Sequence, residues 1–171
     1  IKDWDNKKAI ILLGPRQVGK TTLIQNLVKN TNVLKLNGDD PQTRLQLSNA
    51  NFNFLKNLVA EYDTIFIDEA QRIENIGLAI KLIIDADLGK QLIITGSSSL
   101  DLGNKINEPL TGRKWEYKLF PLSWKEIVKE YTFANAITRL EEFLIYGMYL
   151  EIVTSSDKKR LLRSLAGSYL Y

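Results

Sequence analysis

The sequence predicts a three-layer α/β fold in which a mainly parallel β-sheet is covered by helices on both faces. Three short runs are almost entirely apolar, as expected for strands in the middle of such a sheet: residues 9–13, 65–67 and 92–95. Residues 33–36 and 115–119 are less uniformly apolar and predict strands nearer the edges. Stretches with helical spacing separate these runs, so strand and helix alternate about five times along the chain.

Apolar residues that recur every three or four positions predict the helices between these strands. Three such stripes comprise residues 23, 24, 27 and 28, residues 55, 58, 59 and 62, and residues 76, 79, 80, 83 and 84. A further helix is predicted to begin at Pro41 with an acidic cap from Asp39 or Asp40, and the alternative is that these carboxylates approach a metal site.

The pattern changes after Pro121, where only helical stripes follow. We therefore predict an α/β core over residues 1–122 and a helical segment over residues 123–171, interpreted as part of a lid or of a linker to a further C-terminal domain. Because the chain begins at Ile1 and ends inside a helical pattern, we expect it to be a fragment of a longer protein.

The composition excludes several kinds of chemistry. The 171 residues include no cysteine and no histidine, which removes disulfides, the usual zinc sites, thiol nucleophiles and histidine acid–base catalysis. Catalysis must then use carboxylates, lysine, arginine, hydroxyls, amides and a bound cation. The apolar runs are too short to cross a bilayer and no secretory leader opens the chain, so we expect a cytoplasmic protein without a membrane partner.

Residues 14–21, Gly-Pro-Arg-Gln-Val-Gly-Lys-Thr, match the Walker A pattern G-x-x-x-x-G-K-[ST]. The glycines let the backbone curl so that successive N–H groups point at an anion, and the following helix adds the positive end of its dipole. The pattern follows an apolar strand and opens an amphipathic helix over residues 21–29, as this mechanism requires.

We therefore predict a site for a nucleoside triphosphate with Mg²⁺. Lys20 would reach the β- and γ-phosphates, and the Thr21 hydroxyl would bind Mg²⁺. For Arg16 we favour a structural role, closing the loop against the protein, over a phosphate contact. The predicted nucleotide-binding residues are Gly14, Pro15, Arg16, Gln17, Val18, Gly19, Lys20, Thr21 and Thr22.

An apolar strand over residues 64–67 runs into Asp68 and Glu69, as in a Walker B segment. Asp68 would hold Mg²⁺ through water, since this ion keeps much of its hydration shell. Glu69 would orient and deprotonate the attacking water, which favours hydrolysis over a kinase that transfers phosphate to another acceptor. ATP is preferred to GTP because neither residues 6–9 nor residues 104–107 match the guanine-reading N-K-x-D element.

The strand over residues 92–95 runs into a turn of small polar residues. In ATPases that insert a strand between the two Walker segments, such a turn carries a polar sensor aimed at the γ-phosphate. Ser97 is the first candidate for this sensor and Thr95 the second. Alternatively, the serine-rich turn caps the helix that follows from about Leu100.

With these motifs the chain resembles a family of predicted AAA-type ATPases of bacteria and archaea, in which a P-loop ATPase domain precedes a poorly characterised second domain. The resemblance rests on G-P-R-Q-V-G-K-T at 14–21, I-F-I-D-E-A-Q at 65–71, I-I-T-G-S-S-S at 93–99, L-T-G-R at 110–113 and F-P-L-S-W-K-E at 120–126. Residues 146–151 resemble a glycine–proline–glutamate block of the family, with Leu150 in place of the proline. The resemblance implies an ASCE-type P-loop fold with strand order 5-1-4-3-2 and Mg²⁺-dependent ATP hydrolysis.

Arg113 lies between the helix after the sensor turn and the last strand. In AAA-type assemblies this is a common place for an arginine finger, which reaches the γ-phosphate of a neighbouring subunit and is worth about 10³–10⁵ in rate. This interpretation implies a homo-oligomer. The alternative is that Arg113 pairs with a nearby acid or caps the helix.

A second functional hypothesis is a nucleotide-gated DNA-binding module of origin-recognition-like type. Its DNA contact would be a basic cluster near the start of the last helix, formed by Lys158, Lys159, Arg160 and Arg163. The alternative is that this cluster is simply the solvated face of an amphipathic helix.

Overall fold

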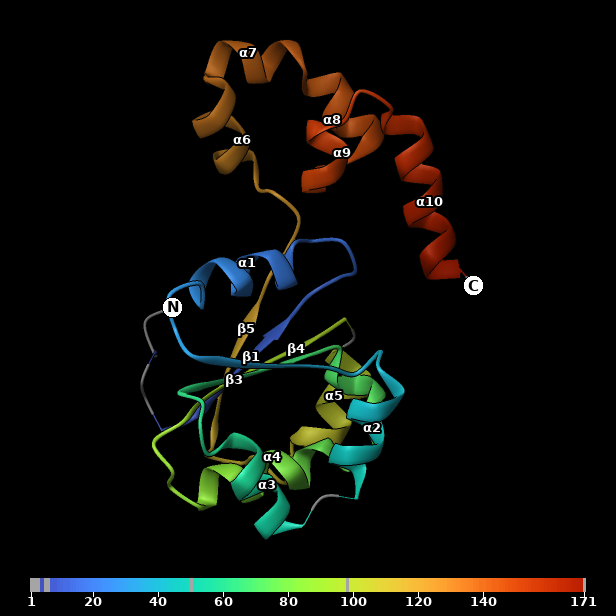
Figure 1. Ribbon diagram of the computed structural model, residues 1–171. Coiled ribbons are helices and arrows are strands. Elements are labelled where there is room, and N and C mark those ends of the chain that lie inside the picture. The colour runs from blue at the N-terminus through green and yellow to red at the C-terminus, as the bar shows by residue number, and fades with distance from the viewer. Residues whose placement is uncertain (1–3, 5–6, 50, 98, 171) are drawn as a thin grey trace. The chain divides into compact units, whose positions relative to one another are not determined.

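A five-stranded parallel sheet with strand order β2-β3-β4-β1-β5 organises the first part of the chain (Figure 1). The computed structural model describes all residues except 1–3, 5–6, 50, 98 and 171. The strands are β1 (Ala9–Leu13), β2 (Val33–Asn37), β3 (Thr64–Asp68), β4 (Gln91–Gly96) and β5 (Lys114–Lys118). Read in the opposite direction, this is the predicted order 5-1-4-3-2, so the predicted P-loop fold is confirmed.

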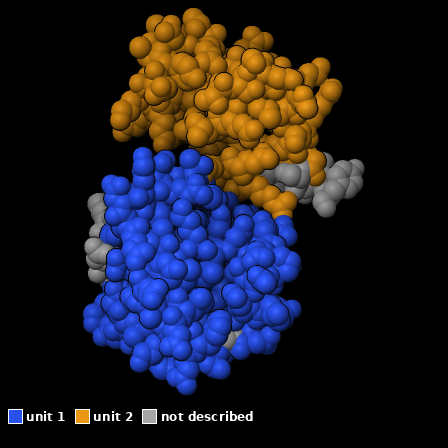
Figure 2. Space-filling view, viewed as in Figure 1, with its two compact units in different colours: residues 1–14, 20–119 blue, residues 15–19, 120–171 orange. Residues whose placement is uncertain are grey.

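The contacts divide the chain into two compact units (Figure 2). Unit 1 comprises residues 1–14 and 20–119, and unit 2 comprises residues 15–19 and 120–171. The short loop 15–19 is therefore grouped with unit 2, although it connects β1 to the next helix of unit 1. The predicted boundary between an α/β domain ending at residue 122 and a helical segment beginning at residue 123 stays a prediction.

Burial explains why each strand has its place in the sheet. β1 is buried at every position and β4 likewise, and β3 is buried up to Asp68. These three strands are the inner ones, as their apolar sequences predict. β2 and β5 contain only half-buried and exposed residues and form the two edges. The predicted division into inner and edge strands is confirmed.

Helices of unit 1 cover both faces of the sheet (Figure 1). They are α1 (Lys20–Leu27), α2 (Pro41–Ser48), α3 (Phe52–Val59), α4 (Ile76–Asp85) and α5 (Ser99–Ile106), with a 3₁₀ turn, η1 (Ala70–Arg72), after β3. Side chains alternate along a strand, so Leu12 packs with α1 whereas Ile11 and Leu13 join the larger cluster with α2 to α5. The three-layer arrangement therefore follows from the strand period.

Only half of the apolar stripe predicted for α1 is buried. Ile24 and Val28 are buried against Leu12, Phe66 and Ile93. Leu23 and Leu27, by contrast, are 38% and 39% exposed. This single short helix buries a narrower stripe than the apolar pattern of its sequence indicates.

The predicted cap of α2 is confirmed and assigned to Asp40. Its carboxylate accepts hydrogen bonds from the backbone N–H groups of Gln42 and Thr43, each at 3.1 Å, and from the Thr43 hydroxyl at 2.8 Å. The Thr43 hydroxyl is the largest cause that lowers the pKa of Asp40 below its usual value. The cap is therefore charged at neutral pH and is lost as the pH falls through that lowered pKa.

Beyond residue 120, the described part of unit 2 consists of helices and the loops that connect them. Its helices are α6 (Trp124–Tyr131), α7 (Phe133–Thr138), α8 (Leu140–Tyr146), α9 (Leu150–Thr154) and α10 (Lys158–Leu170). The first four of these helices share a small core of Ile127, Ala136, Phe143 and Val153. Apolar residues at helical spacing over 124–131, 140–144 and 161–169 predict α6, α8 and α10, whereas α7 and α9 are too short to show a period. No described helix is long and apolar enough to cross a membrane.

Candidate nucleotide-binding site

The candidate site forms where β1, β3 and β4 end. These three strands are neighbours and run parallel, so their carboxyl ends lie at one edge of the sheet. The segments that follow them begin at Gly14, at Glu69 and at Ser97. Crevices at the carboxyl ends of parallel strands are where ligands bind in open α/β sheets.

Residues 14–21 turn sharply instead of continuing β1. Gln17 and Gly19 have positive φ angles of 59° and 94°, and the second lies in a region that side chains rarely adopt. The helix α1 then begins at Lys20. Lys20 is only 5% exposed, and its Nζ donates a hydrogen bond of 2.8 Å to the carbonyl oxygen of Gly14. The loop therefore places a buried cation at the amino end of a helix, where an anion is favoured.

Asp68 is held by groups from three different segments. Its Oδ2 accepts a 2.7 Å hydrogen bond from Thr21 Oγ1, and its Oδ1 accepts from the Glu69 backbone N–H at 3.1 Å. The hydroxyl of Thr95, which is fully buried in β4, also donates to Oδ1. The structure thus brings together Thr21 and Asp68, the two predicted metal-binding residues.

Glu69 has an unusual backbone conformation. Its φ and ψ angles of 49° and 42° are left-handed, which costs a non-glycine residue roughly 1–2 kcal/mol. The loop after β2 packs directly on this backbone, since a Cβ at Gly38 would lie 2.3 Å from the Glu69 carbonyl oxygen. Gly38 N–H also donates to the Asp68 carbonyl at 2.8 Å. Strain of this kind is typical of functional sites, where the surroundings hold it in place.

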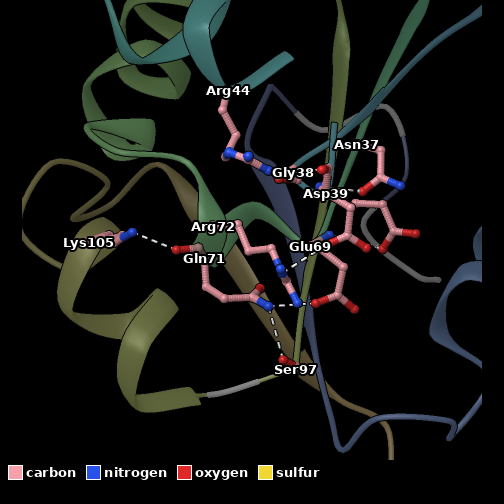
Figure 3. Close-up of polar contacts among 10 residues, drawn as sticks. Asn37, Gly38, Asp39, Arg44, Glu69, Gln71, Arg72, Ser97 and Lys105 are labelled. Carbon is pink, nitrogen blue, oxygen red and sulfur yellow. Dashed lines mark hydrogen bonds and ion pairs between the residues drawn. The ribbon is translucent and has the colours of Figure 1, made fainter. Parts of the chain in front are cut away.

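Gln71 joins Glu69 to Ser97 (Figure 3). Its Nε2 lies 2.5 Å from Glu69 Oε2 and 3.0 Å from Ser97 Oγ. Sequence reasoning missed Gln71, although it belongs to the I-F-I-D-E-A-Q block quoted above. Its position two residues after Glu69 was the signal that could have indicated a role. The 3₁₀ turn that directs its side chain toward Glu69 was not predicted.

A second group of polar contacts lies beside Glu69 and Gln71 (Figure 3). Arg72 forms an ion pair of 2.8 Å with Asp39, and Arg44 Nη1 donates to the carbonyls of Gly38 and Asp39 at 2.9 and 2.8 Å. The Arg72–Asp39 pair is about half exposed, so its energetic contribution is small. These contacts connect the loop after β2 to the turn after Glu69, and they account for Asp39 without a metal.

Arg113 does not join the site of its own chain. Its guanidinium pairs with Asp85 through Nε–Oδ1 and Nη2–Oδ2 contacts of 2.6 and 3.3 Å. It directly precedes β5 and therefore lies at the amino ends of the strands, the edge opposite Asp68. The alternative that Arg113 pairs with a nearby acid is what the structure shows.

Several other residues predicted to bind nucleotide or DNA have exposed side chains. Thr22 and Arg16 are exposed. In the basic cluster of α10, Lys158 donates to the Ser155 carbonyl and lies 3.7 Å from Glu142, whereas Lys159, Arg160 and Arg163 are exposed. DNA contact by this cluster stays a prediction.

The oxygen ligands at this edge suit Mg²⁺. A hydroxyl and a carboxylate in direct contact are the ligand types that a magnesium–nucleotide complex uses, with water and phosphate oxygens completing the octahedron. Across the described ranges of the chain, no group of three or more histidine, cysteine or acidic residues is arranged to hold a metal. The hydroxyl of Thr21 and the carboxylate of Asp68 are two oxygen ligands of the kind that suits this ion.

The fold and this edge of the sheet define a P-loop NTPase. The chain belongs to the AAA domain family, whose model matches residues 6–128, and it is accordingly a nucleotide-binding domain of ATPase type. A solved structure, the Walker-type ATPase PABY2304 of Pyrococcus abyssi, matches the fold with a TM-score of 0.63 at 16% identity. That match covers 98% of this chain and 69% of the other.

Curated relatives are longer proteins. The chain is 27% identical to the uncharacterised protein MJ1544 of Methanocaldococcus jannaschii, over 96% of this chain and 41% of the relative. It is 31% identical to the uncharacterised protein Rv2008c of Mycobacterium tuberculosis, over 69% of this chain and 26% of the relative. The chain thus spans less than half of the length of either relative.

Proposed function

We propose that this domain binds ATP with Mg²⁺, hydrolyses it, and couples its nucleotide state to a conformational change in attached domains. The observation that carries the proposal is the 2.7 Å hydrogen bond from Thr21 Oγ1 to Asp68 Oδ2. It joins the end of the phosphate loop to the acidic end of β3, 47 residues further along the chain. Phosphoryl transfer in P-loop NTPases needs these two groups together.

Each residue has a defined role in the proposed reaction. Lys20 exchanges its contact with the Gly14 carbonyl for oxygens of the β- and γ-phosphates, and Thr21 and Asp68 hold the cation. Mg²⁺, when bound, supplies charge neutralisation at the phosphate oxygens. Ser97 donates its hydroxyl hydrogen to a γ-phosphate oxygen, a role that suits it better than Thr95, whose hydroxyl donates to Asp68. Glu69 orients the attacking water and accepts its proton.

Replacing Asp68 with Asn should raise the Mg²⁺ concentration needed for half-maximal ATP turnover by about 10- to 100-fold, the effect expected for a residue that holds a metal through water. An amide keeps the size of the side chain but loses the charge. The measurement is a Mg²⁺ titration of phosphate release at saturating ATP. Asp87, an exposed residue paired with Lys7, supplies the matched control Asp87→Asn. An unchanged Mg²⁺ requirement in Asp68→Asn would contradict the assignment.

If Arg113 acts on a neighbouring subunit, specific ATPase activity should rise with protein concentration, because the active species is then an oligomer. Arg113→Ala should lower the plateau by about 10³-fold or more and leave ATP affinity unchanged. Asp85→Asn removes the partner that Arg113 has within its own chain and should retain activity. If specific activity is independent of protein concentration and the Arg113→Ala variant is active, Arg113 has only the structural role of its ion pair with Asp85.

A further inference from the structure

The side-chain amide of Gln71 lies between two residues of the proposed reaction (Figure 3). A glutamine amide nitrogen carries two hydrogens. With Glu69 Oε2 at 2.5 Å and Ser97 Oγ at 3.0 Å, Gln71 Nε2 can donate one hydrogen to each. The two partners follow different strands, β3 and β4, so Gln71 connects the ends of both.

The turn that carries Gln71 is held from behind by α5. Lys105 Nζ donates to the carbonyl oxygens of Gln71 and Ile73 at 2.5 and 3.1 Å. These contacts fix the backbone on both sides of Arg72, and a fixed backbone limits the positions that the Gln71 side chain can reach. Gln71 therefore holds its partners from a rigid base, as a positioning residue must.

The other side of the Gln71 amide lies against Gly96. A Cβ at Gly96 would lie 3.0 Å from Gln71 Oε1 and 2.7 Å from Leu102 Cδ2, so the amide occupies space that a side chain would need. Gln71 Oε1 is buried and has no hydrogen-bond partner among the described residues. Turning the amide over would place this oxygen against the Glu69 carboxylate, which is repulsive, so Glu69 sets its orientation.

This orientation determines what Ser97 can do. Because Ser97 Oγ accepts a hydrogen from Gln71, its own hydroxyl hydrogen can be donated to a third group. In the proposed reaction this third group is a γ-phosphate oxygen. Donation by a hydroxyl makes its oxygen a better acceptor, so a phosphate bound at Ser97 strengthens the hydrogen bond from Gln71.

We propose that Gln71 is a positioning residue that couples the γ-phosphate, sensed at Ser97, to the placement of the Glu69 carboxylate. The coupling rests on the proposed ATPase function and adds a connection to it. With ATP, the chain of hydrogen bonds from phosphate through Ser97 and Gln71 to Glu69 is complete. With ADP, the γ-phosphate is missing from this chain of hydrogen bonds, and Gln71 holds Glu69 less firmly.

The test is Gln71→Met, which keeps the length of the side chain and removes the amide. We expect kcat to fall by about 10²-fold, the typical consequence of misplacing a catalytic group. ATP affinity, measured by calorimetry, should stay unchanged, because Lys20 and the phosphate loop are intact. Gln46, an exposed glutamine on α2, supplies the matched control Gln46→Met, which should behave as the wild type in both measurements.

A double-mutant cycle separates coupling from a merely structural effect. Ser97→Ala alone should lower kcat and the preference for ATP over ADP in binding. In the Gln71→Met background, the same change should have little further effect on kcat, because the connection to Glu69 is already broken. It should still lower the preference for ATP over ADP, since Ser97 itself contacts the phosphate. Independent effects on kcat that multiply would overturn the proposal.

Thermal unfolding measures whether Gln71→Met is folded. If it is not, Gln71→Glu provides a second variant with a side chain of the same length. It should also lose turnover and keep ATP affinity. Wild-type kcat in either folded variant overturns the coupling, and so does a loss of ATP affinity as large as the loss of kcat/KM. An inactive wild-type protein in the same assay would instead count against the ATPase function, so the two failures are distinguishable.

Discussion

Lys20→Ala should abolish nucleotide binding, weakening ATP by more than about 10²-fold, since a hydrogen bond to a charged group contributes about 1.5–3 kcal/mol and Lys20 would contact more than one phosphate oxygen. Lys20 is almost fully buried at the start of α1 and donates to Gly14. No other residue of the Walker A pattern offers both a positive charge and this position. Calorimetric titration with ATP and with ADP measures the effect directly.

Lys29→Ala is the control for this experiment, because Lys29 is exposed and lies shortly after α1 in the sequence. It should bind ATP as the wild type does. The contact between Lys20 and Gly14 also suggests a purely structural alternative, in which the lysine only closes the loop. That alternative predicts a lower melting temperature and unchanged ATP affinity in Lys20→Ala, and this pair of results would contradict the proposed site.

Glu69→Gln should leave ATP binding intact and lower turnover by about 10²–10⁴-fold, the usual contribution of a general base. Glutamine has nearly the same shape and can still accept a hydrogen bond from Gln71 through its Oε1. The local geometry should therefore persist while the ability to take a proton from water is lost. Phosphate release at saturating ATP, together with the ATP dissociation constant, separates these two effects.

Glu74→Gln is the matched control, since Glu74 is exposed and lies five positions after Glu69. Normal turnover in Glu69→Gln would show that another group activates water. Following the fate of the γ-phosphate in the same assay also tests the kinase alternative. Transfer to an acceptor other than water would favour that alternative, whereas release as inorganic phosphate supports hydrolysis.

Much of the fold could be predicted because it depends on local patterns. Strands buried on both faces must be apolar at every position, and this property separated β1, β3 and β4 from the edges β2 and β5. The cap at Asp40 was predictable for the same reason, since its hydrogen bonds reach only two and three residues along the chain. The contact between Thr21 and Asp68 followed from strand ends that share one edge of a parallel sheet.

Predictions were incomplete where an element is too short or its environment decides the outcome. The helices α7 and α9 have six and five residues, less than two full turns, and leave no period to detect. Leu23 and Leu27 match the helical stripe of α1 and are nevertheless partly exposed. For Arg113, sequence position allowed a role in a neighbouring subunit, whereas the structure shows its ion pair with Asp85.

The sequence alone located the residues of the candidate site, because the phosphate loop and the acidic pair are each formed by consecutive residues with a recognisable spacing. Tertiary structure alone decided which groups connect these parts. The Gln71 amide donates a hydrogen bond to Ser97, 26 residues further along the chain. Arg72 forms an ion pair with Asp39, and these two residues follow the neighbouring strands β3 and β2. Such hydrogen bonds depend on where the chain returns in space, and no local pattern of residues specifies that.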